Sequence, residues 1–178
     1  KMYVVGANGD DINEYALSTA WDVSTASYTQ NFSVSSQDTQ PWGVFFKTDG
    51  TKMYVNGNVN DNINEYNLST AWDISSASYS QNFSFTTQTT NVYQLYIKSD
   101  GLSLFITGRI GTTGTDYGVF EYSLSTAWDV STMSYVRFYN TYSETAASSG
   151  GIFFKPDGKK MFVGRTAASA QLIEYTLA

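Results

Sequence analysis

The chain has 178 residues, ten basic and sixteen acidic side chains, a formal net charge of −6, and neither cysteine nor histidine. This composition excludes disulfides, thiolate nucleophiles, Cys/His zinc sites and a Ser-His-Asp triad, and the acidic balance is unsuited to binding nucleic acid. The hydrophobic fraction is 42% without a long apolar run, which indicates a folded domain and no membrane insertion. Acidic, cysteine-free chains rich in Ser, Thr and Asn favour an extracellular, cell-surface or virion location.

Short strands are predicted along the whole chain, grouped into four segments. Residues 1–36 hold three strands, residues 37–87 and 88–141 hold four each, and residues 142–178 hold three. The strands expected in the second segment are 42–47, 52–56, 62–68 and about 79–85. Alternation such as Ile63-Asn64-Glu65-Tyr66 supports this assignment, and no stretch has a helical period. Asp49-Gly50 is a typical hairpin turn between the first two strands.

The segments are copies of one repeat. Leu-Ser-Thr-Ala-Trp-Asp occurs three times, with its tryptophans at 21, 72 and 128, so the copies are 51 and 56 residues apart. Lys1-Met2-Tyr3-Val4 returns as Lys52-Met53-Tyr54-Val55 and, with changes, in the later copies. Four antiparallel strands per repeat of 51–57 residues predict an all-β fold, a β-propeller of four-stranded blades.

Two stretches carry a resemblance to known repeats. Phe-Phe-Lys-x-Asp-Gly-x-Lys-Met-Tyr-Val at 45–55 and Ile-x-Glu-Tyr-x-Leu-Ser at 63–69 resemble propeller repeats of the YVTN and NHL type, which include lactonase-like propellers. The longer string Leu-Ser-Thr-Ala-Trp-Asp-Val-Ser-Thr-Ala-Ser-Tyr is similar to repeat proteins of marine phages and bacteria. The resemblance implies the fold, whereas propellers serve as binding modules, scaffolds and enzymes alike.

The predicted strands do not complete four blades. The first segment lacks the innermost strand and the last lacks the outermost, which leaves unpaired sheet edges. Three arrangements fit: a fragment of a longer array, an irregular small ring, or a ring completed by another copy. We expect a fragment, and self-association through the terminal strands.

One face of the propeller is the candidate ligand-binding face. The turns on one side of the blades are uniform between copies, whereas the loops on the other side differ, and function concentrates in loops on a rigid scaffold. Trp42 and Tyr93 align at the entrance of the inner strand, where the fourth copy has Gly150. The candidate residues on this face are Trp42, Tyr93, Gln40, Gln94, Asn60, Asp61, Arg109, Asp116 and Arg165.

Other repeated residues have structural interpretations. The three tryptophans are expected to be buried anchors between blades rather than sugar platforms. Glu14, Glu65, Glu121 and Glu174 recur at one strand position and are expected to form hydrogen bonds or salt bridges. Asp10, Asp11 and Asp61 are secondary candidates for calcium, although no spacing matches an EF-hand and solvated turns explain them better. No cofactor and no resident metal is expected.

The leading functional hypothesis is a non-catalytic binding or surface-structural module that recognises a glycan or a protein, on a phage or bacterial surface protein. One alternative is a metal-dependent lactonase-like or lyase-like enzyme, since lactonase-like propellers hold a metal in the axial channel with acidic and amide side chains. The inner strands of this chain carry apolar residues such as Val44, Phe46 and Leu95 instead. The other alternative is a pure structural scaffold.

Overall fold

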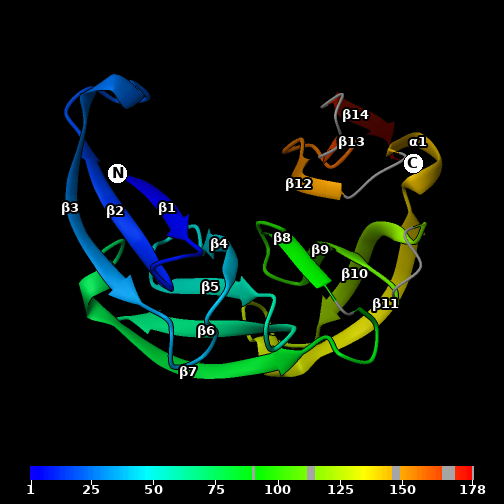
Figure 1. Ribbon diagram of the computed structural model, residues 1–178, viewed down its shortest axis with the longest axis horizontal. Coiled ribbons are helices and arrows are strands. Elements are labelled where there is room, and N and C mark those ends of the chain that lie inside the picture. The colour runs from blue at the N-terminus through cyan, green and yellow to red at the C-terminus, as the bar shows by residue number, and fades with distance from the viewer. Residues whose placement is uncertain (90, 112–114, 146–148, 166–170, 178) are drawn as a thin grey trace.

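The computed structural model describes residues 1–89, 91–111, 115–145, 149–165 and 171–177, which form four antiparallel sheets (Figure 1). The first sheet consists of β1 (Met2–Gly6), β2 (Asp11–Leu17) and β3 (Ala26–Ser33). The second consists of β4 (Pro41–Phe46), β5 (Lys52–Gly57), β6 (Asn62–Leu68) and β7 (Ala77–Ser84). The third consists of β8 (Asn91–Ile97), β9 (Ser103–Arg109), β10 (Tyr117–Leu124) and β11 (Met133–Asn140). The fourth consists of β12 (Ser149–Phe154), β13 (Lys160–Arg165) and β14 (Gln171–Thr176).

The strands pair in chain order within each sheet, so the predicted all-β organisation and the 3-4-4-3 division of strands are confirmed. Glycines at positive φ form the hairpin turns between the first two strands of the second, third and fourth sheets, with φ values of 74° at Gly50, 73° at Gly101 and 71° at Gly158. Only glycine adopts this backbone conformation without a steric cost, which explains the repeated Asp-Gly pair.

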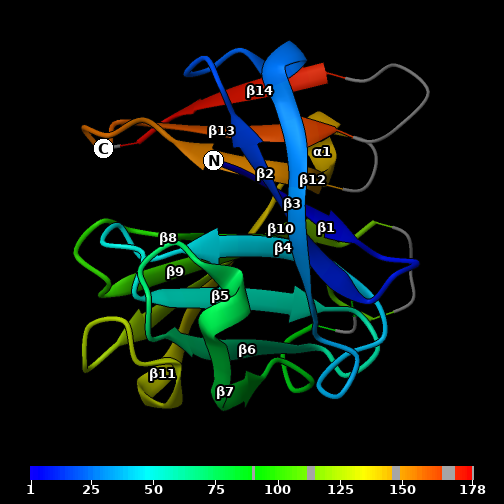
Figure 2. The ribbon, with the colours of Figure 1, turned by 90° about the vertical axis from the view of Figure 1, so that its left-hand side faces the viewer.

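The sheets stand side by side in an arc, with the first and fourth sheets at its two ends (Figures 1 and 2). β1 packs beside β4, β4 beside β8, and β8 beside β12, so these four strands line the inside of the arc. Each hydrophobic cluster lies between two neighbouring sheets; one, for example, joins Tyr54 and Ile63 of the second sheet to Leu104 and Phe120 of the third. Burial of apolar side chains therefore holds the sheets to each other.

Short helical turns were missed by the sequence analysis, which treated the Trp-Asp segments as loops. Each segment forms a 3-10 turn, at Val23–Thr25, Ile74–Ser76 and Val130–Thr132. The preceding aspartates Asp22, Asp73 and Asp129 cap these turns by accepting a hydrogen bond from the backbone N–H two residues later. Asp before a short Ser-containing turn is a recognisable N-cap signal. A single α-helical turn, α1 (Tyr142–Thr145), precedes β12, and no described helix has the length and apolarity that crossing a membrane requires.

Each Trp-Asp turn, meaning residues 18–25, 69–76 or 125–132, belongs to one sheet and, in the second and third sheets, docks on the sheet before it. At the first junction, Glu14 of β2 accepts hydrogen bonds from the backbone N–H of Ile74 (3.4 Å) and from the side-chain amide of Gln30 (3.0 Å). Gln30 also donates to Asp73 (2.8 Å), and Lys1 pairs with Glu14 (2.6 Å).

The second junction repeats this arrangement. Glu65 accepts from the backbone N–H of Val130 (3.2 Å) and from Gln81 (2.9 Å), while Lys52 pairs with Glu65. Gln81 also donates to Asp129 (2.7 Å). The predicted role of the repeated glutamates as hydrogen-bonding devices is therefore confirmed at Glu14 and Glu65.

Tyrosines and glycines complete the same two junctions. The hydroxyl of Tyr3 donates to the backbone carbonyl of Trp72 (2.6 Å), and that of Tyr54 donates to the carbonyl of Trp128 (2.7 Å). The Trp72 ring lies over Gly50 and the Trp128 ring over Gly101, so closely that a Cβ at either glycine would collide with the ring. Each glycine thus provides both the positive φ of the hairpin turn and the space in which the tryptophan ring packs.

The expectation of three equivalent buried tryptophans is confirmed for Trp128 alone; it is wrong for Trp21 and for Trp72, although Trp72 still packs over Gly50. The side chain of Trp128 is 8% exposed, that of Trp72 is 37% exposed, and that of Trp21 is 96% exposed. All three share a positive φ of 64–67°. The difference arises because Trp21 belongs to the first sheet, and no sheet among the described residues precedes it. The expected self-association of terminal strands stays a prediction.

Truncating Trp128 should destabilise the protein far more than truncating Trp21. Trp128→Ala removes a buried ring from between the second and third sheets and is expected to cost about 3–5 kcal/mol. Trp21→Ala removes the same residue from the same motif in an exposed setting and should cost less than about 0.5 kcal/mol. Urea unfolding of both variants measures the difference; similar losses would contradict this account of the junction.

Stability should also depend on pH through Glu14. Burial raises the pKa of Glu14, but hydrogen bonds from Lys1, Gln30 and the Ile74 N–H outweigh it, so the net pKa is lowered. Stabilisation from the ionised carboxylate is therefore complete above the unfolded carboxyl pKa of about 4.3 and is lost as the pH falls through the lower folded value. Glu14→Gln is expected to cost about 2 kcal/mol at pH 7, and little once wild-type Glu14 is itself protonated.

Urea unfolding of Glu14→Gln at several pH values measures this cost, and Glu174→Gln is the matched control. Glu174 pairs with Lys160 as Glu14 pairs with Lys1, but its side chain is 47% exposed. An exposed pair of this kind contributes less than about 1 kcal/mol. Glu14→Gln should not lower the free energy of unfolding equally at neutral pH and at the lowest pH where the protein remains folded. An equal loss would show that the charge of the carboxylate does not stabilise the junction.

Candidate functional site

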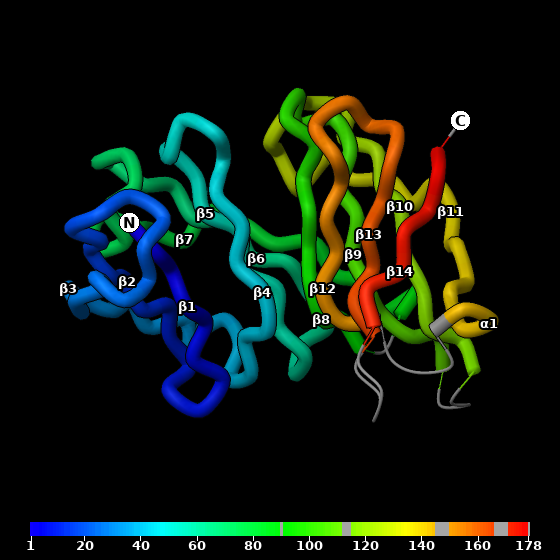
Figure 3. Tube along the Cα trace, turned by 90° about the horizontal axis from the view of Figure 1, so that it is seen from above, coloured from blue at the N-terminus to red at the C-terminus, as the bar shows by residue number. Residues whose placement is uncertain are grey.

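The varied loops gather at one end of the sheets (Figure 3). They comprise the connections between β1 and β2, β5 and β6, and β9 and β10, together with the connections that lead into β4, β8 and β12. The Asp-Gly hairpins lie at the opposite end of the same sheets. Part of the predicted face, residues 90, 112–114, 146–148 and 166–170, lies outside the described residues.

Trp42 and Tyr93, which the sequence aligns at the entrance of the inner strand, contact each other in the structure. Trp42 is the second residue of β4 and Tyr93 the third of β8, two neighbouring inner strands. Their rings contact edge to face, with centroids 6.0 Å apart. The Trp42 side chain is 48% exposed although Pro41 and Gly43 beside it are buried. The indole is thus held by a neighbouring ring while much of its surface remains open to solvent.

Amide side chains surround this aromatic pair. Gln94 follows Tyr93, and its side chain lies against Gly43, the residue after Trp42. The backbone carbonyl of Tyr93 accepts from the side-chain amide of Asn56 (3.2 Å). Gln40 precedes Pro41, and its carbonyl accepts from the backbone N–H of Asn58 (3.0 Å). Uncharged donors and acceptors therefore border an exposed aromatic surface.

Asp38 is a member of this face that the sequence analysis missed. Its side chain is 1% exposed and accepts from the backbone N–H of Gln40 (2.7 Å) and of Asn60 (3.1 Å). It thereby fixes the two loops that carry Gln40, Asn60 and Asp61. The signal was an aspartate two residues before the amide it caps, the pattern of an Asx-turn.

Asp61 has an unusual electrostatic setting. Burial, and then the charge of Asp38, raise its carboxyl pKa above the ordinary value. One of its carboxylate oxygens is buried without a hydrogen-bond partner among the described residues. Asp61 itself has a φ of 45°, a left-handed conformation that aspartate and asparagine tolerate better than most residues.

The two predicted arginines occupy corresponding places in neighbouring sheets. Arg109 ends β9 opposite Asn91, and Arg165 ends β13 opposite Ser149. The Arg109 guanidinium lies 5.9 Å from the centre of the Tyr117 ring, while Arg165 reaches the side-chain oxygen of Gln171 (3.5 Å). Asp116 accepts from Asn140 (3.4 Å). These contacts place Arg109, Asp116 and Arg165 beside the loops between the second and third strands of their sheets.

The secondary metal candidates are not brought together. Asp11 accepts from the amides of Asn13 (2.7 Å) and Asn31 (2.9 Å), and Asp10 is a turn residue with a φ of 50°. Both belong to the loop of the first sheet, whereas Asp61 belongs to the second. Within the described ranges, no group of three or more acidic side chains is placed to hold a metal ion.

Comparisons with known proteins support the fold. No family model and no curated protein matches the sequence. A "putative 6-phosphogluconolactonase" from Bacteroides fragilis has a similar structure, with a TM-score of 0.62 and 16% identity over 92% of this chain and 44% of that one. A protein from Lactobacillus plantarum has a TM-score of 0.61 and 13% identity over 99% of this chain and 50% of that one. A chain of a nidogen/laminin complex has a TM-score of 0.60 and 9% identity over 95% of this chain and 55% of that one. The chain thus spans about half the length of these structures.

These similarities, together with the arc of antiparallel sheets of three or four strands, define the class of fold: the chain is built of β-propeller blades. The predicted fold class is therefore confirmed. At these identities the comparisons establish the fold alone.

The raised pKa of Asp61 predicts a stabilising substitution. Because the folded state favours the protonated carboxyl, the ionised form lowers stability at pH values above the folded pKa, and this cost disappears in acid. Asp61→Asn, which suits the positive φ equally well, should raise the free energy of unfolding by about 1 kcal/mol at pH 7. The gain should shrink towards pH 3. Urea unfolding at both pH values measures it, and a loss of stability at pH 7 would contradict the electrostatic account.

Proposed function

We propose that this protein is a non-catalytic binding module that recognises a neutral glycan on the face carrying Trp42 and Tyr93. The observation that carries the proposal is the half-exposed Trp42 ring, fixed by Tyr93 on two adjacent inner strands. A rigid aromatic side chain presents a large contact area at low conformational-entropy cost.

The chemistry of the surroundings favours a sugar over a charged ligand. The apolar face of a pyranose ring stacks on an indole, while its hydroxyls exchange hydrogen bonds with amides such as those of Gln40, Gln94 and Asn60. Binding sites commonly combine aromatic surface with a few polar groups that fix orientation. Arg109 and Arg165 lie at the ends of β9 and β13 and are not needed for contact with a neutral sugar. An extracellular or virion location suits this function and stays a prediction.

A lactonase-like enzyme is the second candidate. It is favoured by the name of the Bacteroides fragilis structure and by the carboxyl of Asp61, whose pKa is raised by burial and then by the charge of Asp38. A carboxylate with a raised pKa is a candidate general base. Asp38 is committed to two backbone N–H groups, however, which is a structural role.

Glycan binding can be tested with an array of neutral gluco-, galacto- and manno-oligosaccharides, followed by calorimetric titration of any hit. Trp42→Ala should weaken binding at least tenfold while costing less than about 1 kcal/mol of stability, since the ring is half exposed. Trp21→Ala is the matched control, because it removes an exposed tryptophan from a different face and should leave affinity unchanged.

Two results would overturn the proposal. One is a set of glycan hits that survive Trp42→Ala. The other is hydrolysis of 6-phosphogluconolactone that Asp61→Asn abolishes, without saturable binding of any array glycan; this would favour the enzyme.

A further inference from the structure

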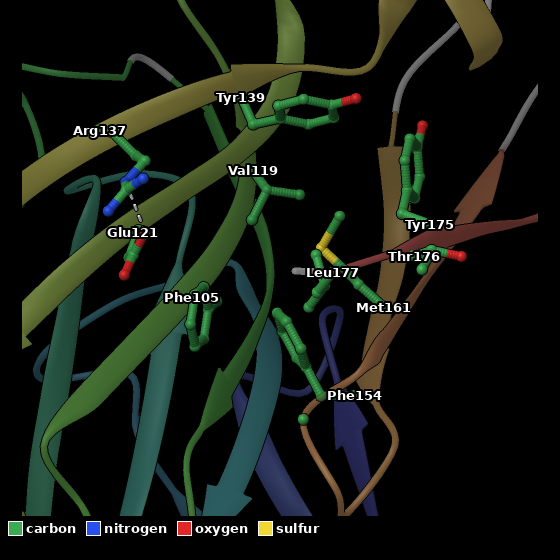
Figure 4. Close-up of a pocket in the computed structure, with 11 residues that line it drawn as sticks. Phe105, Val119, Glu121, Arg137, Tyr139, Phe154, Met161, Tyr175, Thr176 and Leu177 are labelled. Carbon is green, nitrogen blue, oxygen red and sulfur yellow. Dashed lines mark ion pairs between the residues drawn. The ribbon is translucent and has the colours of Figure 1, made fainter.

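Most basic side chains of this protein are neutralised by carboxylates of the same chain. Six lysines and Arg137 form ion pairs with aspartates or glutamates. Figure 4 shows one of these pairs, Arg137 with Glu121 at 2.9 Å, beside a cleft of about 490 Å³ that Phe105 and Gly158 also line. Three basic side chains form no such pair within the described residues: Lys159, Arg109 and Arg165.

Of these three, Arg109 has surroundings that suit a ligand contact. Lys159 is exposed in the hairpin between β12 and β13, at the end of the sheets opposite to the varied loops. Residues 166–170, which follow Arg165, lie outside the described residues. Arg109 ends β9 at the varied-loop end, between β8 and β10. All sixteen acidic side chains lie in the described ranges, so no carboxylate side chain of this chain neutralises Arg109.

Aromatic and backbone contacts fix the position of Arg109. Its guanidinium lies over the Tyr117 ring, 5.9 Å from the ring centre. Its backbone N–H donates to the Thr89 hydroxyl (3.3 Å), and that hydroxyl donates to its carbonyl (2.6 Å). A guanidinium over a ring keeps its N–H groups in its own plane, where they can still bind an anion. The Arg109 Nε is buried without a hydrogen-bond partner in the described part of the chain, so this cation is incompletely satisfied by the protein.

Tyr117 belongs to a pair of stacked tyrosines. The ring centres of Tyr117 and Tyr142 are 6.3 Å apart, and their planes are inclined by 21°. The backbone N–H of Thr141 donates to the Tyr117 carbonyl (2.9 Å), and that of Tyr142 donates to the side chain of Asn140 (2.8 Å). Both tyrosines are partly exposed. A cation therefore lies beside an aromatic surface that backbone hydrogen bonds hold in place.

This cluster continues the aromatic surface of Trp42. Tyr93 contacts Trp42, and Asn91 lies two residues before Tyr93 in β8, about 7 Å along the strand. Asn91 pairs with Arg109 across the sheet, and Arg109 pairs with Tyr117 on its other side. Aromatic rings thus lie on both sides of Arg109, on adjacent strands of two sheets. Such a strip can contact more than one sugar of an oligosaccharide.

We propose that Arg109, Tyr117 and Tyr142 form a second subsite, which binds a sugar that carries a carboxylate, such as a hexuronate. The carboxylate of a hexuronate is attached directly to the sugar ring, so the ring can stack on a tyrosine while the carboxylate accepts hydrogen bonds from the guanidinium. Arginine binds carboxylates through paired, charge-assisted hydrogen bonds. The neutral sugar on Trp42 and the acidic sugar on Arg109 then belong to one oligosaccharide, which extends the proposed function, although the Arg109 subsite rests on its own contacts.

The neighbouring acids make this subsite dependent on Arg109. Asp116 precedes Tyr117 and accepts from the side-chain amide of Asn140 (3.4 Å), and Glu144 lies in α1. Neither of these carboxylates forms an ion pair with Arg109. In a chain of net charge −6, an anionic ligand is repelled unless a cation receives it. Preference for an acidic sugar should therefore disappear with the guanidinium.

The test compares two forms of each ligand on the full chain. Oligosaccharides that contain gluco-, galacto- or mannuronate are arrayed beside their carboxyl-reduced forms, in which the acid has become a neutral hexose. Calorimetric titration of the best hit is expected to show about tenfold tighter binding of the acidic form, as a hydrogen bond to a charged group contributes. This difference should shrink at high salt.

Variants of the protein locate the subsite. Arg109→Gln should remove the preference for the acid and leave the affinity for the reduced form unchanged. Arg109→Lys should keep only part of the preference, since an ammonium lacks the planar fork. Lys159→Gln is the matched control: it removes an unpaired positive charge from the opposite end of the sheets and should change neither affinity. Trp42→Ala should weaken both forms by the same factor. Thermal unfolding checks that each variant folds, and the comparison of the two ligand forms needs no variant at all.

Four outcomes would overturn the proposal: no tighter binding of any acidic form by the unaltered protein, an acid preference that survives Arg109→Gln, a preference that Lys159→Gln also removes, or binding of sulfated but not of carboxylated sugars. The two subsites can fail separately. An acid preference that requires Arg109, with affinities that Trp42→Ala leaves intact, would confirm this subsite and contradict the one proposed at Trp42.

Discussion

A glutamate carboxylate buried between two sheets must have its charge balanced and its lone pairs filled, because an unpaired buried charge costs several kcal/mol. Glu14 and Glu65 meet this requirement with a lysine and a glutamine of their own sheet and a backbone N–H of the next. The carboxylate is therefore satisfied only when the following sheet is in place. The tryptophan, the tyrosine hydroxyl and the hairpin glycine are arranged around this bond.

The concentration of these contacts at one end of the sheets leaves the other end free to vary. The Asp-Gly hairpins and Trp-Asp turns each occur in three copies with nearly the same sequence, because they form the junctions. The loops near Trp42 and Tyr93 carry no such constraint beyond local caps such as Asp38. A rigid frame with changeable loops is the usual basis for recognition in repeat folds.

Local patterns in the sequence were sufficient for the strands, the Asp-Gly hairpins and the role of the glutamates. The equivalent positions of Trp42 and Tyr93 in adjacent copies were also visible in the sequence, whereas the contact between their rings was found only in the structure. The exposure of the tryptophans could not be predicted in this way, because Trp21 and Trp128 have the same local sequence and differ only in whether a sheet lies in front of them. The cleft lined by Phe105 and Gly158 could not be predicted for the same reason, because local sequence does not show whether a neighbouring side chain fills the space.

Because the extensive contacts between sheets join adjacent sheets in the part of the chain that the structure describes, the molecule resembles a short linear chain of coupled units more than a single globule. In such a chain an inner unit is stabilised from two sides and a terminal unit from one. The second and third sheets should therefore melt together, while the first and fourth fray ahead of them. Loss of order would then spread inward from both ends of the arc instead of occurring in one step.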